Sequence, residues 1–362
     1  MNTESRLVKA LTIIIATYLF LLSIKLLGHS FKQFKNLAEI MIMMTSNPFA
    51  GLIIGIVATS LIQSSSTTTS IVVGLVAGDA LNLSNAVPII MGANIGTTIT
   101  NTLVSLGHIN NKVEFRRAFS ASVVHDFFNI CVVIVLFPIE LKFHIISKTA
   151  SVLERGFSGA GGLKMFNPLS FIIDPAIKLL DFLFSFFPYK NLVMIIFSLI
   201  IMFSALAFLI KTIRSIMLTR IEVIIDKYLF RNDVFGFIFG ILMTALVQSS
   251  SVTTSLIIPL AGAGLISVRQ IFPYTIGANI GTTFTAMLAA MATQNSVAVT
   301  VAFSHLCFNV FGIVLFYPFK FIPIRMAEFV GLISSQSTKN LILFITIYIL
   351  LHFVPVVLIF LT

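Results

Sequence analysis

A block of eight consecutive polar residues, QSSSTTTS at positions 63–70, interrupts strongly apolar sequence on both sides. Apolar runs of about 20 residues recur along the 362-residue chain, and a helix of that length crosses the hydrocarbon core of a bilayer. The chain is 57% hydrophobic and 10% charged, whereas about 25% of residues are charged in soluble domains. The sequence therefore predicts an all-α polytopic membrane protein whose polar block is placed for a reason.

The basic residues indicate membrane topology rather than a nucleic-acid partner. The net charge is +10, but lysines and arginines occur in short clusters between the apolar runs. The first apolar run, about 10–28, has no small-residue cleavage site and is expected to be a permanent span. Cys131 and Cys307 lie inside apolar segments, which favours packing over a disulfide.

The polar block is part of an internal duplication. QSSSTTTS at 63–70 recurs as QSSSVTTS at 248–255, and GANIGTT at 92–98 recurs unchanged at 277–283, each pair 185 residues apart. Two homologous halves with interrupted polar stretches are typical of secondary transporters. We divide the chain into an N-terminal span with its connector, repeat 1, a middle segment, repeat 2, and a C-terminal connector with its span: 1–49, 50–140, 141–234, 235–320 and 321–362.

The middle segment is expected to contain three kinds of structure. The polar, Gly-rich stretch around Gly156 and Gly161 predicts a loop, followed by one or two membrane elements. The alternating charge of 211–231 suits an interfacial helix. At the end of the chain, the apolar run 340–361 predicts a last span.

Loop charges predict that the repeats have inverted topology. The positive-inside rule places four basic stretches in the cytoplasm: 108–117, 211–231, 269 and 320–325. Repeat 1 then begins outside and repeat 2 inside, although this leaves Lys32, Lys35 and the basic residues of 142–164 on the outer side. The required odd number of crossings makes each QSSS stretch a re-entrant helical hairpin. Its polar turn must face protein or a water-filled cavity.

The two QSSS motifs are candidate sites for an anion. They supply hydroxyl and amide groups without an ionisable side chain, and helix N-termini at a hairpin turn add backbone N–H donors. Inverted hairpins would bring both motifs together in mid-membrane. The alternative is helix–helix contact through hydroxyl groups, which the duplication disfavours. The predicted phosphate-binding residues are Gln63, Ser64, Ser65, Ser66, Gln248, Ser249, Ser250 and Ser251.

The GANIGTT motifs are candidate sites for sodium, a hard cation that prefers oxygen ligands. The glycines allow an unwound turn with free carbonyls, and asparagine and threonine add side-chain oxygens. No lysine or arginine lies within either motif, so cotransported cations would neutralise the anion and each ligand would raise the other's affinity. The predicted sodium ligands are Asn94, Thr97, Thr100, Thr68, Asn279, Thr282, Thr285 and Thr253.

The sequence resembles the type II sodium–phosphate cotransporter family. The matching stretches are QSSSTTTSIVVGL, VPIIMGANIGTTITNTLVSL, FRRAFSASVVHDFFN, QSSSVTTS and IGANIGTTFTAMLAA. The resemblance implies a sodium/phosphate symporter, not an enzyme, that takes up inorganic phosphate by alternating access of inverted repeats. It implies both QSSS motifs at the substrate site, sodium as the cotransported ion, no organic cofactor, and a multi-pass position in the cell's inner (plasma) membrane.

The chain departs from animal members of that family in two respects. Asn110 and Asn111 stand in a turn where electrogenic animal members carry an aspartate, which leaves the sodium stoichiometry open. The large cysteine-bearing extracellular loop and a C-terminal regulatory domain are absent, which favours a compact prokaryotic member. The oligomeric state is not specified by any of these patterns.

Histidines and aspartates in apolar segments allow further interpretations. His125 with Asn129, and His305 with Asn309, predict paired structural roles, with binding or proton response as the alternative. Intramembrane acids are functional candidates by default: Asp126, Asp174 and Asp181.

Three other functions compete with phosphate symport. The first is sodium-coupled uptake of another oxyanion or a carboxylate. The second, an intramembrane serine hydrolase, lacks a base because neither QSSS segment contains histidine or lysine. The third, a channel, fits inverted hairpins poorly.

Overall fold

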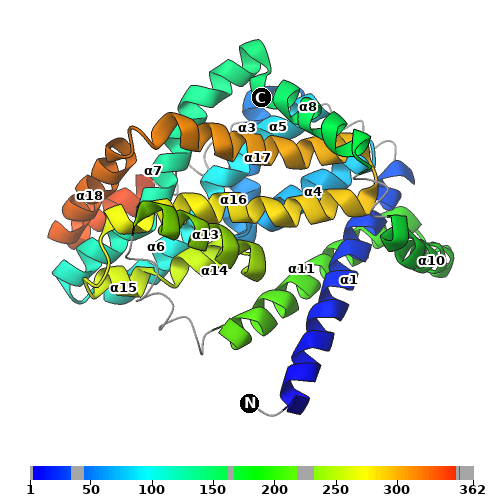
Figure 1. Ribbon diagram of the computed structural model, residues 1–362, viewed down its shortest axis with the longest axis horizontal. Helices are drawn as coiled ribbons and strands as arrows, with labels where there is room; N and C mark the ends of the chain where they lie inside the picture. Colours follow the sequence, from blue (N-terminus) through cyan, green and yellow to red (C-terminus); the bar gives the residue numbers. More distant parts are fainter. Residues whose placement is uncertain (1–2, 34–44, 162–166, 218–231, 348–349, 351–362) are drawn as a thin grey trace.

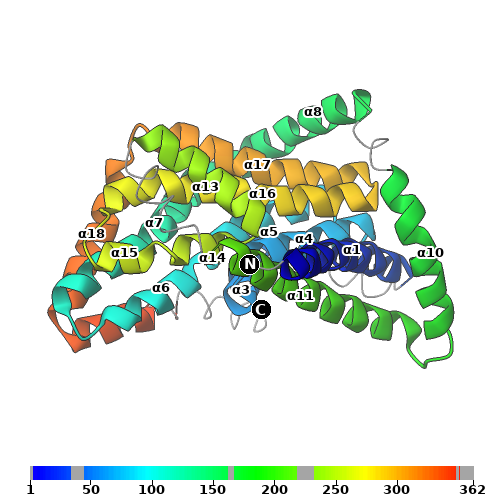
Figure 2. The ribbon, with the colours of Figure 1, turned by 60° about the horizontal axis from the view of Figure 1, so that its bottom comes forward.

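The computed structural model describes residues 3–33, 45–161, 167–217, 232–347 and 350 (Figures 1 and 2). Every regular element in these ranges is helical, which confirms the predicted all-α class. The elements of the N-terminal part and repeat 1 are α1 (Thr3–Gln33), α3 (Pro48–Ile62), α4 (Ser65–Ala77), α5 (Leu83–Ile95), a 3₁₀ turn (Gly96–Thr98), α6 (Ile99–Ser105), a second 3₁₀ turn (Leu106–His108) and α7 (Lys112–Phe143).

The remaining helices belong to the middle segment, repeat 2 and the C-terminal part. They are α8 (Ile145–Gly159), α10 (Asn167–Phe184), α11 (Lys190–Met217), α13 (Asp233–Val247), α14 (Ser250–Ser255), α15 (Ile258–Gly262), α16 (Val268–Thr293), α17 (Ser296–Phe316) and α18 (Phe321–Gln336). The Gly-rich stretch predicted as a loop is helical as far as Gly159, and Gly161, with φ +83°, follows the helix end. The predicted start of the loop was therefore wrong, because isolated glycines weaken a helix without breaking it.

Some predicted elements lie partly outside the described residues. Of the basic connector at 211–231, only the first seven residues are described, at the end of α11. The last predicted span, 340–361, is described as helix over Thr338–Ile347, and most of the rest falls outside.

Several helices of repeat 2 match helices of repeat 1 at an offset of 185 residues. α13 covers the residues of α3 shifted by 185 positions, and α16 begins 185 residues after α5. The helices α16 and α17 lie side by side in both views (Figures 1 and 2). The sequence duplication is therefore a structural duplication as well.

Glycines bring α3 into backbone contact with α5, and α13 into backbone contact with α16. A Cβ added to Gly55 would overlap the carbonyl of Ile89, so α3 and α5 cross without side chains between them. In repeat 2, a Cβ on Gly240 would overlap the carbonyl of Tyr274, the equivalent position. Small residues at such crossings are typical of membrane helices, where close backbone approach replaces the hydrophobic effect as the source of contact.

The outer surface and helix lengths fit a bilayer. Four helical segments in the described residues are long and apolar enough to cross a membrane: Val8–Leu27, Leu83–His108, Lys112–Phe143 and Ser296–Phe316. Large apolar side chains such as Ile14, Ile134 and Val314 are more than 60% exposed, as lipid-facing residues are. Helices α1 and α11 pack together beside the body formed by the repeats (Figure 1).

Candidate functional site

Each QSSS motif is a break between two helices with the same local geometry. α3 ends at Gln63, whose φ of 57° is left-handed, and Ser64 then caps α4 by accepting a hydrogen bond from the Thr67 N–H at 3.2 Å. In repeat 2, Gln248 has φ 56° and Ser249 accepts from the Val252 N–H at 3.3 Å. The predicted turn at QSSS is confirmed as a helix break in both repeats.

Most serines of both breaks are buried, whereas the two glutamines are more exposed. Gln63 is exposed, and Ser64 and Gln248 are intermediate. The other predicted phosphate-binding residues are buried, with at most 6% of their surface exposed: Ser65, Ser66, Ser249, Ser250 and Ser251. These hydroxyl groups therefore lie inside the protein without an ionisable neighbour in their own motif.

A threonine pair holds each break together. Thr59 in α3 donates to Thr68 in α4 at 3.0 Å, and the equivalent Thr244 and Thr253 lie 2.8 Å apart. Thr68 and Thr253 are predicted sodium ligands. Their partners on the preceding helix, Thr59 and Thr244, were not identified from the sequence, although both lie at equivalent positions of the duplication.

Hydrogen bonds join the break in repeat 2 to repeat 1. The Ser251 hydroxyl donates to the backbone carbonyl of Gln63 at 3.3 Å and to that of Thr97 at 3.2 Å. The side chains of Asn101 and Thr254 bond each other at 2.9 and 3.1 Å. The two QSSS motifs and the first GANIGTT motif therefore meet at one place.

This junction is asymmetric. The position equivalent to Asn101 is Ala286, and the residue equivalent to Thr254 is Thr69. The Thr69 hydroxyl is buried and has no hydrogen-bond partner among the described residues. One half of the duplication thus has an amide–hydroxyl pair that the other half lacks.

Histidines exchange contacts between the repeats. His125 of repeat 1 lies with Nε2 2.5 Å from the Asn279 amide oxygen of repeat 2, and His305 of repeat 2 lies 3.3 Å from that of Asn94 in repeat 1. All four residues are buried. The amide oxygens of Asn94 and Asn279, the two asparagines among the predicted sodium ligands, therefore each already contact a histidine.

A second asparagine in each repeat braces the GANIGTT motif. Asn129 donates to the backbone carbonyl of Asn94 at 2.6 Å, and Asn309 donates to that of Asn279 at 3.1 Å. Each of these two contacts lies within one repeat, whereas the Asn279 amide also donates to the Asn129 amide oxygen at 2.9 Å and so joins the repeats.

The GANIGTT motifs differ between the repeats. In repeat 1, a 3₁₀ turn at Gly96–Thr98 separates α5 from α6, as an unwound motif would require. In repeat 2, α16 runs through the motif without interruption, so the expectation of an unwound turn there was wrong. The glycines serve close packing instead: a Cβ on Gly281 would meet Thr244 and the backbone of Ile241.

The four predicted threonine ligands in or just after the GANIGTT motifs fall into two groups. Thr97 and Thr282 donate to carbonyls one turn earlier, Ala93 and Ala278, each at 3.0 Å. By contrast, Thr100 and Thr285 have buried hydroxyl oxygens with no partner among the described residues, as has the Gln248 amide oxygen. These oxygens are free to coordinate a ligand.

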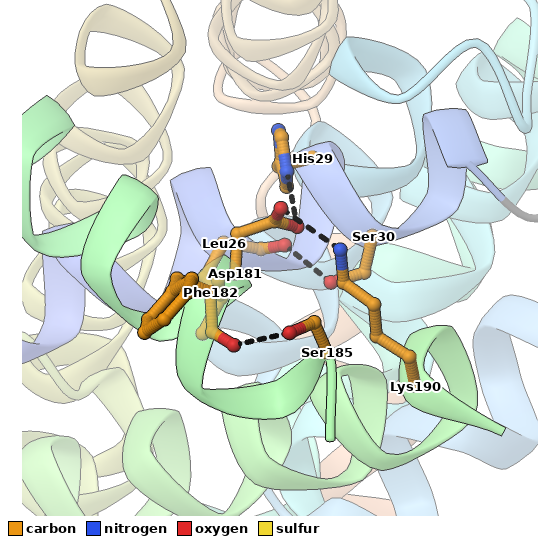
Figure 3. Close-up of polar contacts among 7 residues, drawn as sticks. All are labelled: Leu26, His29, Ser30, Asp181, Phe182, Ser185 and Lys190. Carbon is orange, nitrogen blue, oxygen red and sulfur yellow. Dashed lines mark hydrogen bonds and ion pairs between the residues drawn. The ribbon is translucent and has the colours of Figure 1, made fainter. Parts of the chain in front are cut away.

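The acidic candidates Asp174 and Asp181 hold helices together away from this junction. Lys25 contacts Asp174 at 2.5 Å, and Asp181 contacts both His29 at 3.0 Å and Lys190 at 2.8 Å (Figure 3). These pairs join α10 to α1 and α11 beside a cavity of about 340 Å³. The third candidate, Asp126, is buried in α7 beside His125.

The described residues do not offer a cluster of side chains of the kind that binds transition metals. No group of three or more histidine, cysteine or acidic side chains gathers anywhere in the described ranges. The candidate ligands at the junction are hydroxyl, amide and carbonyl oxygens, which suit hard cations.

Known proteins resemble the chain over most of its length. Sodium-dependent phosphate transport protein 2B of Homo sapiens is 31% identical over 91% of this chain and 62% of its own length. Protein 2A of Ovis aries is 33% identical over 93% of this chain and 64% of its own. The chain thus spans less than two thirds of the length of these relatives. No solved structure is similar enough to count as a match. The family model described as Na⁺/Pi-cotransporter matches residues 19–165 and 200–320, so the chain belongs to that family.

Proposed function

We propose that the chain couples sodium entry to the uptake of inorganic phosphate across the cell's inner (plasma) membrane. Its relatives are sodium-dependent phosphate transport proteins, and most of both repeats lies within the matched family region. The observation that carries the proposal is the hydrogen bond from Ser251 to the Gln63 carbonyl, because it brings the two QSSS breaks together.

Phosphate binds between the two breaks, held by hydroxyl and backbone N–H groups. The buried serines at both breaks provide neutral donors, and α4 begins at the first break with N–H groups that lack intrahelical partners. Neutral donors tolerate a buried anion only when a cation accompanies it, because a lone charge at bilayer depth is expensive.

Sodium supplies that charge. Thr100 and Thr285 carry the buried, unpartnered hydroxyl oxygens best placed to coordinate it, and the 3₁₀ turn at Gly96–Thr98 adds carbonyl oxygens. The amide oxygens of Asn94 and Asn279 each contact a histidine of the other repeat and keep a second lone pair with which to coordinate sodium. Sodium binding and the contacts between the repeats are therefore coupled.

The repeats are inverted, with re-entrant hairpins at QSSS, and transport proceeds by alternating access. α3 and α13 have 15 residues each, about 22 Å of helix, which is too short for a hydrocarbon core of about 30 Å. Reciprocal contacts such as His125–Asn279 and His305–Asn94 are typical of two units related by a pseudo-two-fold axis.

Competing functions have weaker support. A serine hydrolase needs a base that contacts the serine, whereas the buried His125 and His305 bond asparagines. Uptake of another oxyanion or a carboxylate would use the same donors, so competition by arsenate, sulfate and succinate distinguishes it from phosphate uptake.

The test is phosphate uptake into proteoliposomes with and without an inward sodium gradient. We expect sodium-dependent uptake that Ser65→Ala and Ser250→Ala each reduce at least tenfold, since each removes a donor to a charged group. Ser151→Ala, in α8, serves as the matched control because its hydroxyl bonds only its own helix. Uptake that persists without sodium, or serine variants equal to the control, would refute the proposal.

A further inference from the structure

The starts of α7 and α16 lie at the same end of the molecule (Figure 2). A second polar cavity is lined by residues of these two helix starts. Its volume is about 380 Å³, and it is enclosed by the start of α7, the turn between α15 and α16, and α18. Asn279 lies 11 residues further along α16, about 16 Å along the helix axis. The cavity is therefore separate from the QSSS junction. Its lining residues are Val113, Arg116, Arg117, Ser120, Gly264, Ile266, Ser267, Val268 and Glu328.

Two arginines give this cavity a net positive charge. Neither Arg116 nor Arg117 forms an ion pair or a side-chain hydrogen bond with any described residue. Glu328 lines the same cavity without pairing with either guanidinium group, so the lining carries a net charge of about +1. Guanidinium groups left with open donors are suited to bind oxyanions in two-point contacts.

The turn before α16 positions one of these arginines. Gly264 adopts a φ of +78°, and a Cβ at this residue would overlap the guanidinium of Arg117. The Arg117 guanidinium thus lies close to the Gly264 backbone, where any larger residue would displace it. Both arginines line the cavity and are exposed to solvent.

A largely buried serine in the lining supplies an independent indication of a ligand. Ser120 lines the cavity, is only 3% exposed, and its hydroxyl makes no hydrogen bond to any described residue. Buried polar groups normally have a partner. On the opposite wall, the 26-residue α16 begins with Ser267 as its cap, so its first backbone N–H groups also face this end.

We propose that this cavity binds a tetrahedral phosphate group, held by Arg116, Arg117 and the Ser120 hydroxyl. The same chemistry is offered by free inorganic phosphate and by the headgroup phosphate of a membrane lipid. The proposal is independent of the transport function, because it uses none of the residues at the QSSS junction. A transporter with this site would bind phosphate at two separate places.

A single introduced tryptophan reports occupancy of the cavity, since the chain contains no tryptophan. Val113 lines the cavity and is 59% exposed, so Val113→Trp is sterically tolerated. The purified full chain carrying this change is titrated with inorganic phosphate and, separately, with short-chain phosphatidic acid. We expect a saturable change in tryptophan emission with at least one of them: a response to inorganic phosphate assigns a free-ion site, and a response to phosphatidic acid alone assigns a headgroup site.

Second substitutions identify the groups that bind. Adding Arg117→Gln is expected to weaken the response at least tenfold, because a hydrogen bond to a charged group is lost, and Ser120→Ala is expected to weaken it less. Arg269→Gln is the matched control, since Arg269 is exposed at the same end of α16 without lining the cavity. Adding Ser65→Ala with Ser250→Ala should leave the response unchanged.

Three results would overturn the proposal. The first is no saturable response to either probe, and the second is an Arg117→Gln titration that coincides with its parent. The third is loss of the response on adding Ser65→Ala with Ser250→Ala, because it would place the binding event at the QSSS junction. Melting temperatures of all variants, compared with the parent, identify any change that acts through unfolding.

Discussion

His125 of repeat 1 contacts Asn279 of repeat 2, with 2.5 Å between the imidazole Nε2 and the amide oxygen. The two residues are 154 positions apart in the chain, and both are buried. The contact has a reciprocal counterpart in the other repeat, so the two halves of the molecule are joined through residues of the same kind.

His125→Ala should destabilise the fold by about 1–3 kcal/mol, because the buried amide oxygen of Asn279 loses its donor. His125→Gln keeps a donor group and should recover part of this loss. Thermal unfolding of the purified variants measures both. Equal melting temperatures for wild type and His125→Ala would show that the contact contributes nothing.

Asn101 and Thr254 should be energetically coupled, since each side chain donates to the other. Asn101→Ala and Thr254→Val, made singly and together, form a double-mutant cycle. We expect each single change to cost about 1–2 kcal/mol and the pair to cost at least ~0.5 kcal/mol less than their sum. Strict additivity in chemical unfolding would contradict the hydrogen bond.

Gly55→Ala should abolish folding or transport, because its Cβ would overlap the carbonyl of Ile89 and force α3 away from α5. Gly240→Ala should do the same in repeat 2 at the Tyr274 carbonyl. Gly156→Ala is the control: this helical glycine faces open space, and alanine there should stabilise α8 by up to ~1 kcal/mol. Expression level, melting temperature and phosphate uptake compare the three, and a Gly55→Ala protein that behaves like the control would disprove the close crossing.

Asp233 should make stability dependent on acid pH. Partial burial raises the pKa of this carboxyl, but hydrogen bonds from Lys320 and Tyr317 outweigh that effect and lower it below its usual value. The ionised form therefore stabilises the fold fully above about pH 3.9, and this contribution is lost as pH falls through the lowered pKa.

The measurement is the melting temperature of wild type and Asp233→Asn between neutral and strongly acidic pH. The two proteins should differ most at neutral pH, with wild type the more stable, and should converge on acidification. A difference that stays constant over the range would show that Asp233 titrates alike in the folded and unfolded states.

Local signals in the sequence were sufficient to locate the helix breaks. Serine after a left-handed residue caps a helix, and this local geometry places Ser64 and Ser249 where the duplicated polar block predicts a turn. The repeat offset likewise predicted which helices correspond. Inverted topology and the hairpins rest on loop charges and helix lengths, and they stay predictions.

Contacts between distant segments were not accessible from the sequence. The partners of Asn94 and Asn279 are histidines 211 and 154 positions away, so an amide that looked like a free sodium ligand is already bonded. The second GANIGTT motif is helical, although its glycines predict an unwound turn. Gly277 and Gly281 pack closely against α13. The equivalent glycines of repeat 1, Gly92 and Gly96, pack as closely against α3, so glycine packing does not distinguish the two motifs.

The single pair formed by Asn101 and Thr254 has a consequence for the resting state of the protein. In a carrier built from two inverted repeats, exchanging the repeat conformations converts one orientation into the other, so identical repeats would give equal populations. Ala286 and Thr69 cannot re-form the pair after that exchange. Under the proposed alternating access, the orientation that contains it would be favoured by one buried hydrogen bond, about 1 kcal/mol, or roughly fivefold in population. On that proposal, a single amide would give the unloaded protein a preferred side.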